Sequence, residues 1–185
     1  GVDKMLLEDF SKKINIKSAK EALKTGISMV PEDRKQDGII ADMSVEKNMT
    51  LSNLDSYTKA ADYVDTYREK TDVRRYIDLL KIKTTSEDLA IKNLSGGNQQ
   101  KVVLAKNLLV NPKIIILDEP TRGVDVGAKY EIYKNIVELA ERGISVIMVS
   151  SELPEILGIS DRIIVMHEGE IKGEFINKDV TQEMI

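Results

Sequence analysis

The sequence predicts an α/β fold in which a mainly parallel sheet carries helices on both faces and contains an inserted all-helical segment. After residue 95, strand-like runs alternate with amphipathic helical stretches, which is the pattern of a parallel sheet. A highly charged stretch from about Asp42 to Lys92 has apolar residues at helical spacing. The chain has 185 residues, 42% of them apolar, which is enough for one well-packed domain with a subdomain.

The first strand is expected close to the N-terminal end of the chain. Ser18 has the side chain of a helix N-cap, a short helix is expected over 19–25, and Gly26 suits the left-handed residue that follows a helix. A buried strand is expected over 27–30. The next residues, 32–38, form a charged loop that closes on a glycine.

The charged middle of the chain is interpreted as two or three helices. Ser44 is expected to cap the first of them, and the stretch 57–82 has its apolar residues at roughly helical spacing. The many charges of this stretch are expected to form a solvated face. The apolar residues are Ala61, Tyr63, Val64, Tyr67, Val73, Tyr76, Ile77, Leu79 and Leu80.

The last part of the chain alternates between helices and strands. The run 113–117 is β-branched almost throughout, which predicts a strand buried on both faces. The later strand over 144–150 is also expected to be buried, and a hairpin is expected to turn at Glu168 and Gly169. The full order is a helix over 96–110, a strand over 113–117, a helix over 127–142, a strand over 144–150, a short helix over 152–158 and the hairpin over 161–175.

Composition excludes several classes of function. The net charge of −4 gives no basic surface for duplex nucleic acid, so no nucleic-acid partner is expected. The chain has no cysteine, which excludes disulfides and thiolate metal sites. Its longest apolar runs, such as 144–149, are far shorter than the roughly 20 residues of a membrane helix. The chain is therefore not expected to cross a membrane.

Two adjacent acids end the strand in "IIILDEP", residues 114–120. Ligands of α/β sheets bind at the carboxyl ends of the strands, so Asp118 is placed to hold Mg²⁺ through its carboxylate. Glu119 is placed to orient or deprotonate a water that attacks a terminal phosphate. The alternative is a strand that merely ends in acids before a proline turn.

The stretch "LSGGN", residues 94–98, supports the phosphate reading. Ser95 is expected to cap the following helix, and Gly96 and Gly97 leave the first backbone N–H groups open to an oxyanion at the positive end of the helix dipole. Each glycine costs about 1 kcal/mol relative to alanine, so a plain capped helix has no need of two. A lysine-bearing phosphate loop is absent, since no Gly-Lys pair occurs in the sequence.

The order "VPEDRKQDG", "LSGGNQQK", "IIILDEPTRGVD" and "VIMVSSELPEILGISDRIIVMHEGEIKGEF" resembles ABC-transporter ATPases. More narrowly, it resembles the second of two tandem ATPase domains in bacterial importers of ribose, galactose or xylose. The resemblance implies a truncated P-loop NTPase (RecA-like) core over 1–39 and 101–185, in which the Walker A part is missing. It also implies a helical subdomain over 40–100 that ends in the signature motif.

The resemblance also implies roles for particular residues. In this family the nucleotide lies between the phosphate loop of one domain and the "LSGG" helix of another, so ATP and Mg²⁺ are the expected cofactors. Glu119 is the implied catalytic residue, and Ser151 stands at the position of the switch histidine. The implied nucleotide-binding residues are Ser95, Gly96, Gly97, Asn98 and Asp125, and the implied Mg²⁺ ligands are Asp118 and Glu32.

Three of these positions depart from the family pattern. Glu32 replaces a glutamine, Ser151 replaces the switch histidine, and Asn98 replaces the usual glutamine of the signature. We expect an asymmetric pair of domains in which this chain supplies its signature helix to the better site. The chain on its own, without a phosphate loop, is expected to be inactive and to bind no ATP tightly.

The expected function is ATP hydrolysis that drives a simple-sugar importer. Its partners would be the first ATPase domain of the same parent chain, transmembrane permease subunits and, indirectly, a sugar-binding protein. Its location would be cytoplasmic, at the inner face of the cell membrane. Two alternatives stay open: a degenerate regulatory or docking half-domain that supplies the signature helix, and an ATPase of a nucleoside or other small-solute importer.

Overall fold

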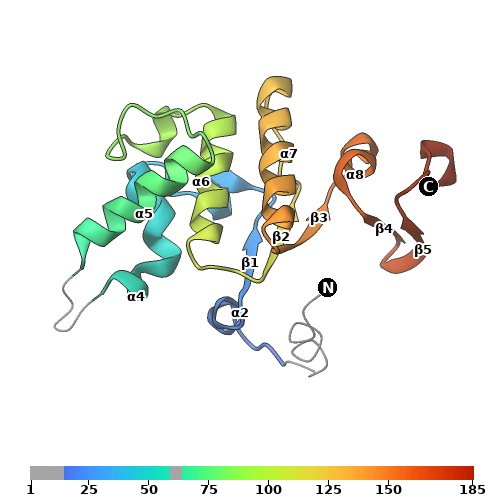
Figure 1. Cartoon of the computed structure of the whole chain (residues 1–185), viewed down its shortest axis with the longest axis horizontal. Helices are drawn as coiled ribbons and strands as arrows, with labels where there is room; N and C mark the ends of the chain where they lie inside the picture. The colour runs from blue at the N-terminus through green and yellow to red at the C-terminus, as the bar shows by residue number, and fades with distance from the viewer. Residues whose placement is uncertain (1–14, 59–63) are drawn as a thin grey trace.

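A three-stranded parallel sheet stands at the centre of the computed structural model, which describes residues 15–58 and 64–185. Its strands are β1 (Ile27–Val30), β2 (Ile114–Asp118) and β3 (Ser145–Val149), side by side in that order (Figure 1). Ile114 pairs with Ile27 on one side and with Ser145 on the other. All three strands run in the same direction, so the predicted parallel sheet is confirmed and its carboxyl ends lie at one edge.

The described residues cover only one face of this sheet, in contrast to the prediction of helices on both. Helix α6 (Gly96–Leu108) packs against β1, and α7 (Val126–Glu141) packs against β3. On the covered face Ile115 is completely buried, whereas Ile147 on the other face is 52% exposed. The expectation that the strand over 113–117 is buried on both faces is therefore wrong, and so is the expectation that the strand over 144–150 is buried. β-branched runs favour any pleated, half-buried surface, so they do not tell one covered face from two.

The charged middle of the chain is helical, as predicted. Its helices are α3 (Val45–Thr50), α4 (Leu54–Tyr57) and α5 (Thr66–Leu79), with short 3-10 turns at Leu51–Asn53 and Ile91–Asn93. The hydroxyl of Ser44 accepts a hydrogen bond from the backbone of Lys47 at 3.1 Å, which confirms the predicted cap. Tyr67, predicted on the apolar side of the stretch, is 83% exposed. Residues 59–63, which include Ala61 and Tyr63, lie outside the described residues.

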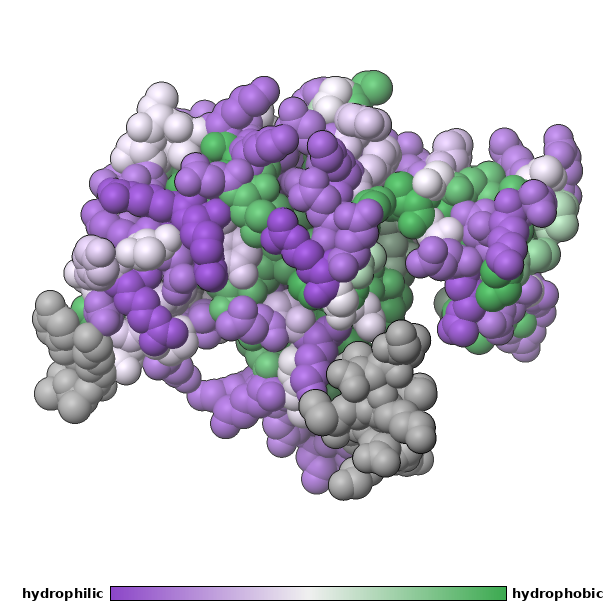
Figure 2. All heavy atoms as spheres, in the orientation of Figure 1, coloured by the Kyte–Doolittle hydropathy of each residue, from purple (hydrophilic) through white to green (hydrophobic). Residues whose placement is uncertain are grey.

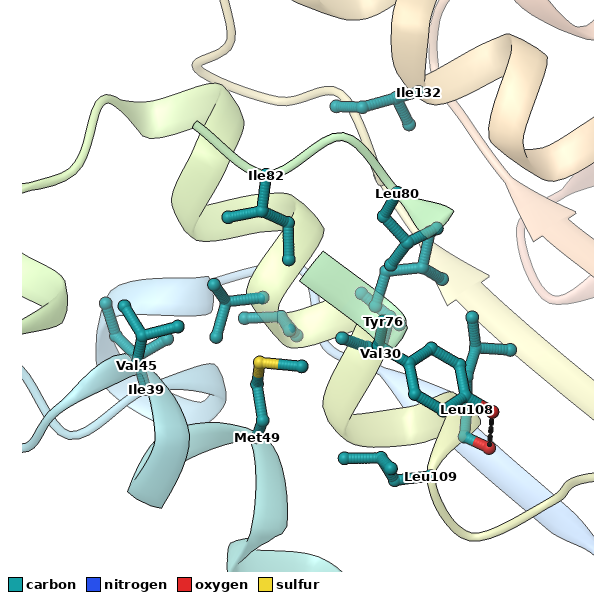
Figure 3. Packing of buried hydrophobic residues seen from close by; sticks show 14 of the residues in the cluster. Val30, Ile39, Val45, Met49, Tyr76, Leu80, Ile82, Leu108, Leu109 and Ile132 are labelled. Atoms are coloured by element: carbon teal, nitrogen blue, oxygen red, sulfur yellow. Dashed lines mark hydrogen bonds between the residues drawn. The ribbon is translucent and has the colours of Figure 1, made fainter. Parts of the chain in front are cut away.

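The helices and the sheet share one hydrophobic core (Figure 3). Met49 of α3 is completely buried, and the hydroxyl of Tyr76 on α5 donates to the carbonyl of Leu108 at 3.1 Å. Helix α6 contributes Val102, Val103, Leu104, Ala105 and Leu108 to this core, and the helix continues without a break across residues 100 and 101. The division into a core over 1–39 and 101–185 and a helical segment over 40–100 stays a prediction.

The N-terminal helix and the C-terminal hairpin follow their local sequence signals. Helix α2 (Ala19–Thr25) is capped by Ser18 and ends at Gly26, whose φ is +86°. Helix α8 (Leu153–Ile159) leads into strands β4 (Arg162–His167) and β5 (Glu170–Ile176), which project from the body of the molecule (Figure 1). Both turn residues between these strands have positive φ, as a tight hairpin requires. A last 3-10 turn spans Gln182–Met184.

Apolar side chains lie exposed along this hairpin (Figure 2), among them Met166 at 64% and Ile171 at 65%. None of the helices in the described part of the chain is both long enough and apolar enough to pass through a membrane.

Candidate functional site

The carboxyl edge of the sheet brings Glu119 and Ser151 together. Glu119 follows the last residue of β2 and has a left-handed backbone, with φ +44°, which few side chains other than glycine adopt without strain. Its backbone N–H donates to the carbonyl of Val149 at 2.9 Å. Its carboxylate Oε1 accepts from the backbone N–H of Ser151 at 2.7 Å. Ser151, predicted to stand at the switch-histidine position, thus holds Glu119 through its main chain.

Asp118 ends β2 with a half-buried side chain. Among the residues that the structure describes, no hydrogen bond or ion pair engages its carboxylate. The described ranges also contain no group of three or more acidic, histidine or cysteine side chains that could enclose a metal ion. Mg²⁺ in nucleotide sites takes one or two carboxylates and completes its shell with phosphates and water. A lone free carboxylate at a strand end fits that kind of ion.

Glu32, the other predicted Mg²⁺ ligand, forms an ion pair with Arg122. Both side chains are about half exposed, at 47% and 65%, so the pair adds little to stability. Its effect is on charge, because Arg122 neutralises the Glu32 carboxylate. The role of Glu32 as a metal ligand stays a prediction.

Arg34 joins the loop after β1 to the loop after β2. Its guanidinium donates to the carbonyls of Arg122, at 2.8 Å, and Gly123, at 3.3 Å. The segment expected to be a plain charged loop forms a single π-helical turn, Arg34–Gly38, whose start is fixed by the side chain of Asp33. A pair of groups 88 residues apart leaves no local signal, so sequence reasoning did not find this contact.

The start of α6 differs from the predicted capping arrangement. Ser95 occupies the N-cap position, but its hydroxyl accepts from the side-chain amide of Asn98 at 2.9 Å and caps no backbone N–H. The other side-chain atom of that amide, Oδ1, accepts from the backbone of Lys83 at 2.8 Å. In the described structure, the backbone N–H groups of Gly96, Gly97 and Asn98 have no acceptor. They are therefore available to an anion at the positive end of the helix.

The two glycines also permit close packing within the chain, which sequence reasoning missed. A Cβ added to Gly97 would lie 2.6 Å from the Cβ of Ala128, on the first turn of α7. A Cβ added to Gly96 would lie 2.8 Å from a guanidinium nitrogen of Arg34. The signature glycines thus let α6 start against α7 and against the loop that Arg34 holds.

Asp125 stands directly before α7 and caps it, because its carboxylate accepts from the backbone of Ala128 at 3.0 Å. Since Gly97 touches the same Ala128, Asp125 and the start of α6 lie close together. Ser95 and Asp125 are both exposed. The predicted site residues therefore form two groups, one at the sheet edge and one at the paired starts of α6 and α7, and the loop 119–125 joins them.

Comparison with known families places this chain in one of them. The family model described as ABC transporter matches residues 5–122. The chain belongs to the ABC transporter family. In this ABC transporter chain the matched range includes the start of α6, the strand β2 and both acids at its end.

Relatives of this ABC transporter chain include two proteins named xylose import ATP-binding protein XylG. The one from Pectobacterium atrosepticum is 56% identical over 174 residues, which is 94% of this chain and 34% of the relative. The one from Photobacterium profundum is 58% identical over 173 residues, with the same two shares. The chain thus spans about a third of the length of these relatives.

Solved ATP-binding cassettes share the fold. A dimeric cassette in a post-hydrolysis state, bound to ADP and Pi, superimposes with a TM-score of 0.71 at 25% identity, covering 87% of this chain and 66% of that chain. A nucleotide-free cassette from an ABC transporter gives 0.72 at 24% identity, covering 89% and 66%. The expected fold class, a P-loop NTPase core with a parallel sheet and a helical insertion, is confirmed.

Proposed function

We propose that this chain is the second ATPase domain in the ATP-binding subunit of an ABC importer for a simple sugar. Two similar proteins are named for xylose import and ATP binding, and each is about three times as long as this chain, which leaves room for a first ATPase domain. The other proposed partners are transmembrane permease subunits and, through them, a sugar-binding protein. The proposed location is cytoplasmic, peripheral at the inner face of the membrane.

The observation that carries the proposal is the open start of α6. Three successive N–H groups there lack an acceptor within the described chain, and the exposed hydroxyl of Ser95 lies beside them. Such a helix start binds phosphate groups through backbone donors and the helix dipole. We infer that it binds the triphosphate of an ATP molecule held mainly by the partner ATPase domain, with Asp125 at the same surface.

The sheet edge would serve this domain's own nucleotide. Asp118 would hold Mg²⁺, which when bound supplies positive charge to the phosphates. Glu119 would orient or deprotonate the attacking water, and the N–H of Ser151 keeps its carboxylate in one orientation. No imidazole is present at position 151, so this edge lacks a cationic donor there. We therefore propose the asymmetric pair, in which the signature helix of this chain completes the more active site.

The test compares two substitutions in the whole protein with its permease. Ser95→Ala removes a donor from the partner's site and is expected to lower the rate of ATP hydrolysis about tenfold or more, since a hydrogen bond to a charged group contributes about 1.5–3 kcal/mol. Glu119→Gln is expected to lower it less. Ser52→Ala, at an exposed serine of the helical segment, is the control and should leave the rate unchanged. A larger loss from Glu119→Gln than from Ser95→Ala would refute the asymmetric assignment.

A further inference from the structure

Glu155 is a buried carboxylate that the proposed mechanism does not use. It lies on α8 and is 5% exposed. Its Oε1 accepts from Thr121 at 2.5 Å, from Tyr133 at 2.5 Å and from Lys129 at 3.2 Å. Its Oε2 accepts from the hydroxyl of Ser150 at 3.0 Å. The loop after β2, helix α7 and the segment after β3 thus meet on one side chain.

The surroundings of Glu155 keep it charged. Burial raises the pKa of its carboxyl, but the hydrogen bonds from Thr121, Tyr133, Lys129 and Ser150 together bring that pKa below its usual value. The same contact, added to burial, raises the pKa of Tyr133 to about 12, so its phenol stays a donor. A buried charge of this kind is costly to leave unpaired, so its donors are held firmly in place.

Two of these donors lie on the two segments that meet at Glu119. Thr121 is two residues beyond Glu119 in the loop after β2, and Ser150 directly precedes Ser151 in the segment after β3. The hydroxyl of Ser150 also accepts from the backbone of Glu152 at 3.0 Å, which fixes the turn of that segment. Glu155 therefore contacts both loops whose relative position sets the hydrogen bond from Ser151 to Glu119.

We propose that Glu155 is a positioning residue that holds segment 150–152 against the loop after β2, so that the Ser151 N–H fixes the carboxylate of Glu119. The role of Glu119 in hydrolysis rests on the function proposed above, but the positioning itself does not. A misplacement of about 1 Å in a reacting group lowers rates on the order of a hundredfold, so the contact matters for the proposed reaction.

The first readout is hydrogen exchange at the Ser151 amide in the whole protein. Glu155→Gln keeps the shape of the side chain and removes its charge. It is expected to speed exchange at this amide about tenfold, as the loss of one hydrogen bond implies, without affecting the amides of β2. Glu141→Gln is the control, because it neutralises an exposed acid of α7 that makes no contact with Glu155 or its donors and should leave the Ser151 amide as it is. If Glu155→Gln fails to fold, Ser150→Ala removes one contact of the same carboxylate and should act in the same direction.

The second readout is ATP hydrolysis. Glu155→Gln is expected to lower kcat at unchanged KM, by no more than Glu119→Gln does, and adding it to Glu119→Gln should cause no further loss. A merely structural role would instead lower the rate in both backgrounds, and that result would overturn the inference. Unchanged exchange at Ser151 overturns it whatever the rate. If Glu155→Gln speeds exchange at the Ser151 amide but the wild-type protein hydrolyses no ATP, the positioning role is supported and the proposed function is rejected.

Discussion

The contact between Gly97 and Ala128 makes a quantitative prediction for Gly97→Ala. The new methyl would lie 2.6 Å from the Cβ of Ala128, whereas carbon atoms ordinarily approach to about 3.5–4.0 Å. Since Ala128 has no rotamer to change, α6 and α7 must move apart by roughly 1 Å. Such overpacking costs about 1–3 kcal/mol, and the better helix propensity of alanine returns up to about 1 kcal/mol. With the full offset, we expect a net loss of about 0–2 kcal/mol in the free energy of unfolding.

Urea unfolding of the single and double variants measures this loss. Ala128→Gly makes room for the new methyl, so the double variant should be more stable than the sum of the single changes by about 1–3 kcal/mol. Gly158→Ala on α8 is the control, because nothing lies within 4 Å of its added Cβ and its backbone is helical. It should stabilise the protein by about 0.5–1 kcal/mol. Additive single changes, or equal effects at Gly97 and Gly158, would refute the packing argument.

Two further predictions concern the loops and the buried acid. Arg34→Ala removes the donors to the carbonyls of Arg122 and Gly123 and should lower the free energy of unfolding by about 1–3 kcal/mol. Lys35→Ala, at an exposed residue of the same turn, is the control. In thermal unfolding, Arg34→Ala should lower the midpoint and Lys35→Ala should change it little. Burial raises the pKa of Glu155, but its hydrogen bonds hold that pKa below its usual value. The charged carboxylate therefore stabilises the fold above the unfolded pKa of about 4.3. This contribution to the free energy of unfolding is lost as the pH falls through the folded pKa. Measured between about pH 6 and pH 3, the stability of the wild type should therefore fall more steeply than that of Glu155→Gln, and equal slopes would contradict this.

The elements that the sequence predicts well are those with local signals. Gly26 and Gly143 have φ of +86° and +88°, and each ends the helix that was expected to end there. The hairpin turns at Glu168 and Gly169 because both residues adopt positive φ. Each of these features depends on one or two residues and their immediate neighbours. Patterns of that length are visible in a single sequence.

The features that sequence reasoning missed depend on contacts between distant residues. Whether a face of the sheet is exposed depends on which helices pack against it. The apolar content of the strands does not show where those helices lie. Arg34 reaches carbonyls 88 and 89 residues away, and Gly97 is required by a methyl group on another helix. Ser95 has the side chain of a cap, yet it pairs with Asn98, since that amide is itself fixed by the backbone of Lys83. Residue type indicated the place of the site, and only packing determined its hydrogen bonds.

The contact between Ser151 and Glu119 shows why a comparison of side chains alone misjudges this part of the chain. Glu119 is held by a backbone N–H, and every residue except proline has one. The identity of the side chain at 151 therefore matters less to the orientation of Glu119 than the position of the segment that carries it. That position depends on Ser150 and, through it, on Glu155. A serine at position 151 can therefore orient Glu119, provided that the buried carboxylate of Glu155 behind the segment is kept.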